Sequence, residues 1–510
     1  MREIPQVLPQ DAYNSELAAN VHPTAYRNPT PAHRYNLVVI GAGTAGLVTA
    51  AGAAGLGARV ALVEKHLMGG DCLNVGCVPS KAVIRASRAA ADVKGAGAFG
   101  VGVPAGTEID FSRAMERMRA IRARISHHDS VERFTKELGV DVFLGEGRFA
   151  GPDRIEVEGA QLRYKRAVIA TGTRAAAPEI PGLAEAGFLT NETVFSLVSR
   201  PRRLAVIGGG PIGSELAQAF QRLGCDVTLL HDREHLLERE DPDAAALVQQ
   251  ALVRDGVRLV LKAAILRVER KGDEKVLHYR SEDGSSDCVV DEILVGAGRQ
   301  PNVLGMELER AGVAYDEKLG VRVDDHLRTT SPRIYAAGDV CMSWKFTHAA
   351  DFAARIVIQN ALFPSLRGGR KLSALNMPWC TYTAPEIAHV GLYEHEANAR
   401  GIPTTTFLRP FSEVDRAVCD GEEEGFVKIH VRKGSDEIVG ATIVAPHAGD
   451  MISEISVAMA GRLGLSRLAN VIHPYPTQAE AIRQIGDLYN RTRLTPWVKA
   501  LFRAWLRWTR

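Results

Sequence analysis

Two cysteines, Cys72 and Cys77, lie five positions apart in the segment GGDCLNVGCVPSK, which leads into a predicted helix. Their spacing permits a small disulfide within one loop. A cysteine sulfur at the N-terminus of a helix has a lowered pKa, which makes its thiolate a better nucleophile and electron donor at neutral pH. The alternative is half of a metal site, but no second close pair completes one. We therefore predict a redox-active pair and no resident metal, although both sulfurs could hold a metal ion that arrives as a substrate.

A glycine-rich turn, GAGTAG, follows the apolar run at residues 35–40 and leads into an alanine-rich helical stretch. Gly41 permits a tight turn, Gly43 lets the backbone approach a pyrophosphate, and Gly46 allows close contact of helix and strand. The N-terminus of the helix offers unpaired N–H groups to the phosphate. A second strand ends in Glu64, which is placed to accept hydrogen bonds from a ribose. Together these features predict a dinucleotide-binding unit.

The same unit recurs from residue 203, where an apolar run precedes GGGPIG, a helix and a strand at residues 226–230. The glycines of this second motif are Gly208, Gly210 and Gly213. Its second strand ends in His231 rather than in an acid, and Asp232 and Arg233 follow. An acid would favour the 2′-hydroxyl of NAD, whereas a cationic group suits the 2′-phosphate of NADP. We expect NADPH, with NADH as the alternative if Asp232 turns toward the ribose; His231 and Arg233 could also be solvated loop residues.

The composition is typical of a globular protein with several domains. The chain has 510 residues, 46% of them hydrophobic, and is too long for a single core. A formal net charge of +2 gives no overall field that would attract nucleic acid. The seven cysteines are odd in number and thinly spread, which favours a reducing compartment, the cytoplasm, over a secreted disulfide framework.

Three further motifs occur along the chain. They are ATG at residues 170–172, GAGRQPN at 296–302 and IYAAGD at 334–339. With the cysteine segment and the two glycine motifs, they resemble the class I pyridine nucleotide-disulfide oxidoreductases, a flavin-dependent family that includes glutathione reductase, dihydrolipoamide dehydrogenase and mercuric reductase. The resemblance covers roughly residues 35–490. It implies an enzyme that passes electrons from NAD(P)H through FAD to the cysteine pair.

The resemblance also implies an α/β fold with two Rossmann-like domains, one for FAD and one for NAD(P), and a C-terminal α+β dimerisation domain that forms a homodimer. The expected parts are an N-terminal extension (1–34), an FAD-binding domain (35–198, completed by 299–375), an NAD(P)-binding domain (199–298), the dimerisation domain (376–490) and a basic amphipathic tail (491–510).

The family pattern assigns roles to individual residues. Cys77 would face the flavin, and Cys72 would attack the substrate. Lys81 would lie near flavin N5 and pair with Glu215 on the helix of the second motif; both could instead be ordinary surface charges. Further residues are expected to contact the cofactors, the last two beside the ribityl and pyrophosphate groups: Thr171, Gly172, Gly298, Gly338 and Asp339.

The line HPYPTQAE, residues 473–480, departs from the family pattern. The family has a histidine, then Pro-Thr and a glutamate, a dyad that serves the cysteines of the partner subunit. Here Tyr475 replaces the histidine, and Glu480 is the glutamate. A phenol with a pKa of ~10 cannot shuttle protons at pH 7 as an imidazole of pKa ~6.5 does. His473 would face the same way as Tyr475 in an extended chain and could partly replace the imidazole, while Glu480 also has capping-box spacing from Thr477.

These residues lead to two candidate substrates. Mercuric reductases are similar in having a Pro-Tyr pair at this place, which favours a thiophilic metal ion, because a metal held by thiolates needs less proton transfer than a disulfide. The cysteine pair that those enzymes carry at their C-terminus is not found after Cys419, the last cysteine of this sequence. The alternative is a dihydrolipoamide dehydrogenase in which His473 is the base.

The segment PWVKALFRAWLRWTR, residues 496–510, has the pattern of a basic amphipathic helix. Residues 491–510 contain six basic and no acidic side chains. Two interpretations are open. The apolar side packs on the protein or its dimer mate, which we favour, or the tail makes peripheral contact with an anionic membrane surface or an acidic partner. The second would make the chain a membrane-docked electron-transfer or redox-sensing flavoprotein.

Overall fold

The computed structural model describes residues 5–363 and 368–510. Residues 1–4 and 364–367, which belong to the predicted extension and FAD domain, lie outside the described residues. Contacts divide the chain into two compact units. The first contains residues up to 208 together with 219–232 and 262–375, and the second contains 209–218, 233–261 and 376–510. The units cut across the predicted NAD(P) domain, and the predicted domain bounds stay predictions.

The first unit is built around a parallel sheet with the strand order β3-β2-β1-β6, and β18 also pairs with β6. The strands are β1 (Tyr35–Ile40), β2 (Val60–Glu64), β3 (Asp141–Leu144), β6 (Ala160–Ile169) and β18 (Ile334–Ala336). All these pairings are parallel. In β1 every residue from Leu37 to Ile40 is buried, as expected for a strand covered on both faces. The sheet is therefore completed by a strand that follows the whole second nucleotide motif.

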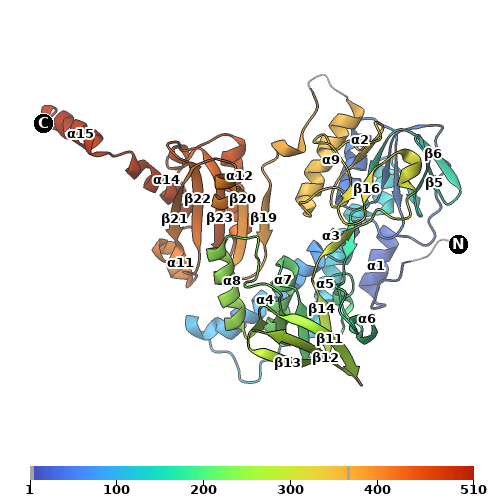
Figure 1. Ribbon diagram of the computed structural model, residues 1–510, viewed down its shortest axis with the longest axis horizontal. Helices are drawn as coiled ribbons and strands as arrows, with labels where there is room; N and C mark the ends of the chain where they lie inside the picture. The colour runs from blue at the N-terminus through green and yellow to red at the C-terminus, as the bar shows by residue number, and fades with distance from the viewer. Residues whose placement is uncertain (1–4, 364–367) are drawn as a thin grey trace. The chain divides into compact units, whose positions relative to one another are not determined.

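Helices from distant parts of the chain pack together on this sheet. Helix α2 (Thr44–Gly55) follows the first glycine turn, and α9 (Thr347–Leu362) packs against it (Figure 1). Gly52 makes this packing close, because a Cβ at that position would lie 2.6 Å from Cδ1 of Ile358. The two helices thus form one layer from segments on either side of the second motif.

The second glycine motif has its own parallel strands in the first unit. Strand β8 (Arg203–Ile207) lies between β9 (Asp226–Leu230) and β14 (Glu292–Val295) and is parallel to both. This is the arrangement that a repeated dinucleotide-binding unit predicts. An antiparallel sheet with the order β11-β12-β13 comes between β9 and β14 in the chain: β11 (Ala264–Lys271), β12 (Glu274–Ser281) and β13 (Gly284–Val290).

Shorter strands and further helices complete the first unit. The strands are β4 (Arg148–Gly151), β5 (Arg154–Val157), β7 (Thr173–Ala175), β15 (Arg299–Pro301), β16 (Tyr315–Asp316) and β17 (Gly320–Val321). The helices are α1 (Ala12–Val21), α3 (Gly70–Asn74), α4 (Cys77–Gly95), α5 (Phe111–Ser126) and α6 (Leu183–Ala186).

The second unit contains an antiparallel sheet with the order β19-β20-β23-β22-β21. Strand β23 (Ile438–Ala445) is buried along its whole length, and α8 (Pro242–Asp255) and α12 (Ala448–Ala460) both pack on it. The remaining elements are β10 (Arg258–Val260), β19 (Pro378–Thr381), β20 (Glu386–Gly391), β21 (Thr404–Pro410), β22 (Phe426–Arg432), α10 (Glu394–Ala399), α11 (Asp415–Asp420), α13 (Leu465–Leu468), α14 (Glu480–Thr492) and α15 (Pro496–Trp508). Helix α7 (Pro211–Arg222) begins in this unit.

Buried charges tie α8 to this sheet. Asp241 caps α8 by accepting hydrogen bonds from the backbone of Asp243 and Ala244. The ammonium of Lys428, on β22, donates to both carboxylate oxygens of Asp241 at 3.0 and 2.9 Å, and to Asp243 at 2.6 Å. The Lys428 side chain is only 9% exposed, so its charge needs these partners. The cluster therefore fixes the start of α8 against β22.

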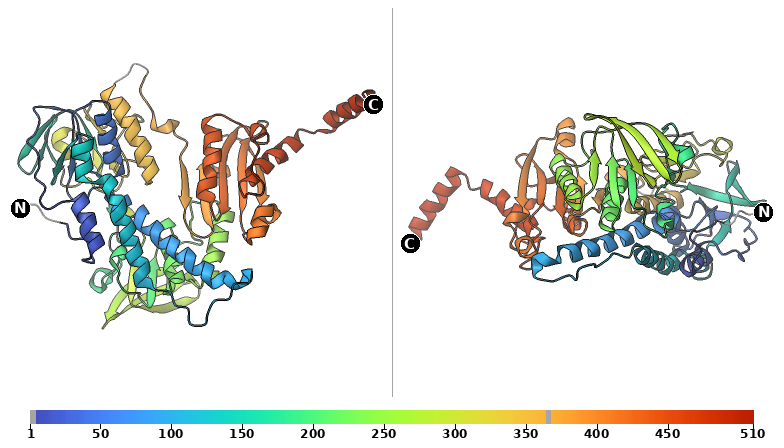
Figure 2. Two further views of the ribbon diagram at one scale, coloured as in Figure 1. Left: turned by 180° about the vertical axis from the view of Figure 1, so that it is seen from behind. Right: turned by 90° about the horizontal axis from the view of Figure 1, so that it is seen from below.

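The last helix, α15, differs from the others of the second unit. Figure 1 and both views in Figure 2 show it projecting beyond α14, away from the β19–β23 sheet. None of its residues is buried. Among the helices of residues 5–363 and 368–510, none combines the length and the apolar character needed to cross a membrane.

Candidate active site

Two helical segments hold the cysteines. Cys72 lies in α3, and Cys77 is the first residue of α4. Gly76 permits the tight connection, because a Cβ there would lie 2.7 Å from the carbonyl oxygen of Asp71. Both cysteines are free thiols, Cys72 partly buried and Cys77 exposed. The hydroxyl of Thr347, the first residue of α9, lies 3.2 Å from the Cys77 sulfur. The pair is therefore held close to the start of a second helix.

The thiol of Cys72 holds its proton tightly, because its pKa is raised. A hydrogen bond from Cys72 to the Cys77 sulfur, together with burial, raises the pKa of Cys72 well above its usual range. The carboxylate of Asp129 adds to this rise. The lowered pKa expected of a sulfur at a helix N-terminus therefore does not hold for Cys72, because its hydrogen bond to Cys77 and its burial both favour the protonated thiol.

An arginine that the sequence analysis did not single out fixes the backbone between the cysteines. Arg122, on α5, is 4% exposed. Its guanidinium donates to the carbonyl oxygen of Asn74 at 2.6 Å and to Oδ1 of Asn14, on α1, at 2.7 Å. The segment predicted as an extension, residues 1–34, thus contributes a helix that supports the cysteine loop.

Arg299 connects the cysteine loop to residues expected around the flavin. Its guanidinium forms an ion pair with Asp71, the neighbour of Cys72, and donates to the Thr173 hydroxyl at 2.6 Å. That hydroxyl donates in turn to Asp339 at 3.0 Å. Burial raises the pKa of Asp71, and the charge of Arg299 opposes the rise. Arg299 lies in the GAGRQPN motif, which could have marked it, although its contacts could not be read from the sequence.

The first glycine turn has the shape of a phosphate cradle. A Cβ on Gly41 would lie 2.4 Å from the carbonyl oxygen of Ala170, and one on Gly46 would lie 1.7 Å from that of Gly41. Gly43 precedes α2 and makes no side-chain cap, so the first N–H groups of the helix are left for an anion. The backbone of Gly70 also comes close, since a Cβ there would lie 2.6 Å from Cα of Gly43.

Glu64 ends β2 beside this cradle. Its carboxylate oxygens accept hydrogen bonds from the backbone N–H groups of Ala42 at 2.6 Å and His66 at 2.7 Å. Burial raises the pKa of Glu64, while these two bonds oppose the rise. A carboxylate held in this way at the glycine turn is suited to a ribose, so the residues present fit a dinucleotide.

The other residues expected around the flavin follow β6 or lie in the two later motifs. The Thr171 hydroxyl donates to the carbonyl oxygen of Asn302 at 2.8 Å, and the Asn302 amide donates back to the carbonyl of Thr171 at 2.9 Å. Gly172, Gly298 and Gly338 have φ values of +64°, +113° and +81°, which favour glycine. Asn302 therefore locks the turn after β6 in place.

The second glycine motif leaves room for a ligand. A Cβ on Gly208 would lie 3.1 Å from the carbonyl oxygen of Gly296, whereas one on Gly210 would meet nothing within 4 Å. Gly213 lies in the first turn of α7. The backbone at Gly210 is therefore open to the close approach of a pyrophosphate.

An imidazole and a carboxylate stand together at the end of β9. His231 is 8% exposed, and its Nδ1 lies 3.4 Å from the Asp232 carboxylate. Arg233 is exposed and lies 3.8 Å from Glu238. The two residues expected at a 2′-phosphate, His231 and Arg233, each lie beside an acid, and the preference for NADPH stays a prediction.

Lys81 lies in α4, one turn after Cys77. Glu215, on α7, is buried, and its carboxylate accepts a hydrogen bond from the backbone N–H of Tyr382 at 2.9 Å. Of the two interpretations of Glu215, the ordinary surface charge is therefore wrong. Its pairing with Lys81 stays a prediction.

Tyr475 is 70% exposed, in the position where the family has its histidine. Its hydroxyl donates to the carboxylate of Asp415, on α11, at 2.9 Å. This acceptor raises the pKa of Tyr475 further. The phenol is therefore even less suited to carry protons at neutral pH than the sequence suggested.

His473 and Tyr475 contact different elements, contrary to the expectation of an extended chain. Nε2 of His473 lies 2.9 Å from the Glu454 carboxylate on α12, and Nδ1 lies 3.0 Å from the carbonyl oxygen of Val471. Both ring nitrogens thus have partners within the chain, and the predicted catalytic role of His473 stays a prediction.

Glu480 begins α14 and pairs with Arg483, one turn later, at 2.7 Å. The capping box expected from its spacing is absent from this helix, because the helix begins at Glu480 with Ala479 as its N-cap, so Thr477 lies outside the capping position; the Thr477 hydroxyl donates to the carbonyl oxygen of Pro474. The structural role expected for Glu480, a capping box shared with Thr477, is therefore not seen in this helix.

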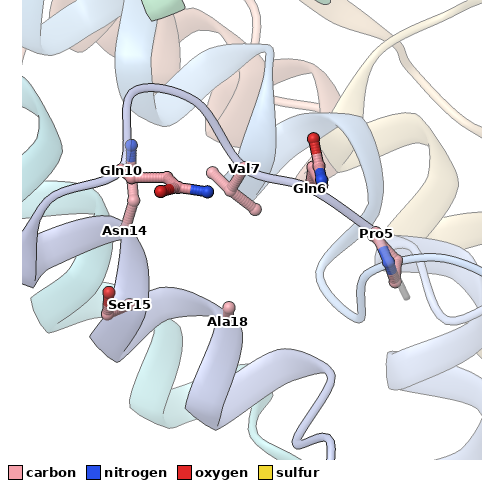
Figure 3. A pocket seen from close by; sticks show the side chains of 7 residues that line it. All are labelled: Pro5, Gln6, Val7, Gln10, Asn14, Ser15 and Ala18. Atoms are coloured by element: carbon pink, nitrogen blue, oxygen red, sulfur yellow. The ribbon is translucent and has the colours of Figure 1, made fainter.

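A pocket between residues 5–10 and α1 lies outside this group of residues (Figure 3). It is lined by Pro5, Gln6, Val7, Gln10, Asn14, Ser15 and Ala18. None of these side chains is titratable, so the pocket offers no acid, base or thiol. It is connected to the cysteine loop through Asn14, whose Oδ1 accepts a hydrogen bond from Arg122.

The parallel strands, the two glycine turns and the cysteine pair define a class, the dinucleotide-dependent thiol oxidoreductases. The chain belongs to the pyridine nucleotide-disulphide oxidoreductase family, whose model matches residues 35–354, and the model of the family's dimerisation domain matches residues 377–485. Members are flavoproteins that use FAD and NAD(P)H. The predicted fold class, enzyme class and cofactors are thereby confirmed, and the dimerisation domain supports a homodimer.

Similar proteins fall into the two groups that the sequence analysis named. A mercuric reductase from Bacillus cereus is 33% identical over 94% of this chain and 75% of its own length. A dihydrolipoyl dehydrogenase from Thermus scotoductus is 34% identical over 90% of this chain and 98% of its own. Among solved structures, the HOCl-induced flavoprotein disulfide reductase RclA from Escherichia coli superposes with a TM-score of 0.79 at 28% identity, over 89% of this chain and 100% of its own. A Cu(II) complex of RclA has the same TM-score.

Proposed function

We propose that this chain is an NAD(P)H-dependent reductase of a thiophilic metal ion, with Cys72 and Cys77 as the ligands of the ion. The observation that carries the proposal is Tyr475, whose proton is held by Asp415 at the place where a disulfide reductase needs a mobile proton. The mercuric reductase relatives and the Cu(II) complex of RclA support a metal as the acceptor. Asp129 gives the surroundings of Cys72 a negative charge that suits a cation.

The proposed reaction balances without a further reactant. A divalent ion displaces one proton from each thiol and is held by both sulfurs. NAD(P)H supplies two electrons and becomes NAD(P)⁺; the ion becomes the zero-valent metal, the sulfurs regain two protons, and the net product is one proton. The first glycine turn and Glu64 would hold FAD, which would supply the hydride-transfer chemistry that connects NAD(P)H to the two sulfurs.

The remaining residues bind and position. The glycine turn and Glu64 hold the flavin dinucleotide, and the second turn holds NAD(P)H, with Arg233 favouring the 2′-phosphate of NADPH. Arg299 holds Asp71 and so keeps the backbone of Cys72 against the flavin residues. Lys81 and Glu215 form the pair beside the flavin, and further contacts to the cofactors come from the residues predicted for them: Thr171, Gly172, Gly298, Gly338, Asp339 and His231.

The test is a substrate panel with the FAD-loaded protein. NADPH and NADH oxidation is measured in parallel with Hg(II), Cu(II), lipoamide and oxidised glutathione. We expect metal-dependent oxidation that is lost in Cys72→Ser and Cys77→Ser and retained in Cys288→Ala, which removes a buried thiol of β13. Strong lipoamide turnover without a response to either metal would overturn the proposal.

A second candidate function is dihydrolipoamide dehydrogenase. It is favoured by one observation, the 2.9 Å contact between His473 and Glu454, which is a histidine–carboxylate pair of the kind that can accept a proton. The substitution His473→Ala should then abolish lipoamide turnover, with Glu454→Gln lowering it. An unchanged rate in His473→Ala removes this candidate.

A further inference from the structure

Helix α15 presents a clean division of side chains around its axis. At about 100° per residue, the three basic residues of the helix fall within roughly 80° of one another: Lys499, Arg503 and Arg507. The opposite side is apolar and carries three of the five tryptophans of the protein, Trp497, Trp505 and Trp508. Such a division is typical of helices that lie at a boundary between water and an apolar phase.

The apolar side of α15 is not covered by its own unit. The exposed fractions are 72% for Trp497, 58% for Trp505 and 78% for Trp508. Leu501, Phe502 and Leu506 are each more than half exposed as well, at 52%, 51% and 64%. The interpretation in which this stripe packs on the body of the protein is therefore wrong for the described residues of the second unit.

The neighbouring helix α14 shows what packing would look like. It is also amphipathic, but it buries Ala481, Ile482 and Ile485 and packs on strands β21 and β22. Helix α15 follows it after a short connection and buries no residue. The second unit therefore buries the apolar side of α14 but leaves the apolar side of α15 exposed.

The charge of residues 491–510 indicates what kind of surface would bind α15. Residues 491–510 carry six basic side chains and no acidic one, so the complementary surface is anionic. Tryptophan combines a large apolar ring with an N–H donor, and it favours the interface between lipid headgroups and acyl chains. An anionic lipid surface satisfies both sides of the helix at once.

We propose that α15 lies in the plane of an anionic membrane surface, with its tryptophan side in the headgroup region and its basic side toward lipid phosphates. Its 13 residues span about 20 Å, too short to cross a hydrocarbon core of ~30 Å, so the helix lies on the membrane. The unit that carries Tyr475 is then docked to the lipid, and the reductase works at a membrane surface. This holds for either substrate.

The test is flotation of the full-length, FAD-loaded protein with vesicles. Phosphatidylcholine alone is compared with phosphatidylcholine mixed with phosphatidylglycerol. We expect binding to the anionic vesicles only, weakened at about 0.5 M NaCl because salt screens the phosphates. Absence of binding to anionic vesicles at low salt overturns the proposal.

Two tail variants separate the two sides of the helix. Removal of three charges in Lys499→Gln/Arg503→Gln/Arg507→Gln should weaken binding on the order of 100-fold, because each basic residue near an anionic surface contributes about five-fold. Replacement of the three tryptophans by serine should abolish binding even at low salt. Both variants should keep the wild-type rate of NADPH oxidation.

A matched control removes three exposed basic residues elsewhere: Arg117→Gln, Arg163→Gln and Lys165→Gln. It should bind as the wild type does, and an equal loss of binding would overturn the proposal, since overall charge would explain it. If the tryptophan variant instead lowers the mass of the assembly in solution and leaves vesicle binding intact, the apolar side belongs to a second copy of the chain, and the proposal fails.

Discussion

Replacing Arg122 tests whether the N-terminal helix supports the cysteine loop. In Arg122→Met the stem of the side chain stays, but the carbonyl oxygen of Asn74 and Oδ1 of Asn14 lose their donors. Both acceptors lie in or beside buried structure, and Asn74 sits between Cys72 and Cys77. The substitution therefore loosens the loop without touching a sulfur.

The magnitude follows from two opposing contributions. Hydrogen bonds from a charged donor contribute about 1.5–3 kcal/mol each, so two bonds amount to roughly 3–6 kcal/mol. Burial lowers the pKa of Arg122 to about 10, and at ~1.4 kcal/mol per pKa unit the buried charge costs about 3 kcal/mol, which methionine avoids. The first contribution exceeds the second by about 1.5 kcal/mol at the middle of its range and by at most about 3 kcal/mol, and this difference is the expected net loss of local stability.

Hydrogen exchange of the backbone amides in residues 70–81 measures this loss directly. A factor of ten accompanies each ~1.4 kcal/mol, so exchange should accelerate about 10-fold and at most on the order of 100-fold, and turnover should fall because the sulfurs are less well placed. The control is Arg117→Met, an exposed residue of the same helix, which should change neither. Wild-type exchange in residues 70–81 of Arg122→Met would refute the reasoning.

Other predictions concern the cradle, the arginine link and proton transfer. Gly46→Ala places a Cβ 1.7 Å from a carbonyl oxygen and should prevent FAD retention, which flavin absorbance measures. The control is Gly55→Ala in the same helix, whose Cβ meets no atom within 4 Å; this variant should retain FAD and be neutral or stabilising by about 0.5–1 kcal/mol. Arg299→Lys loses the forked contact and should lower bound flavin and turnover together, and full retention of both would contradict the link. Because the pKa of Cys72 is raised, its thiolate fraction is small at pH 7 and grows as pH rises, so lipoamide reduction should increase steadily from pH 6 to 9, and a flat profile would contradict this. Tyr475→His should raise lipoamide turnover near pH 7 by supplying an imidazole, which a parallel assay with the wild type measures.

The glycine turns show how far local sequence can reach. Gly41 and Gly46 occur where strand, turn and helix signals follow one another, and each signal depends only on near neighbours. For this reason the two Rossmann-like cores could be predicted, along with the family and its cofactors. The amphipathic pattern of α15 could be predicted for the same reason. The exposure of its apolar side could not be predicted, because it depends on how the rest of the unit packs.

Contacts between distant segments were beyond prediction. Arg122, on α5, connects α1 to the last residue of α3, and no motif or periodicity marks an arginine for such a contact. The raised pKa of Cys72 depends on its hydrogen bond to Cys77, on its burial and on Asp129, which is far from it in the sequence. The capping box expected of Thr477 and Glu480 is absent because the helix begins at Glu480, with Ala479 and not Thr477 at the N-cap.

The pairing of β18 with β6 has a consequence for how the chain is made on the ribosome. Strand β6 ends at Ile169, and β18 begins only at Ile334, so one edge of the central sheet stays open while the intervening segment is synthesised. At a synthesis rate of ~5–20 residues per second this lasts on the order of ten seconds. Helix α9, which packs on α2, emerges later still. The nascent protein should therefore depend on chaperones during this interval, and the flavin should be incorporated only after α9 has left the exit tunnel.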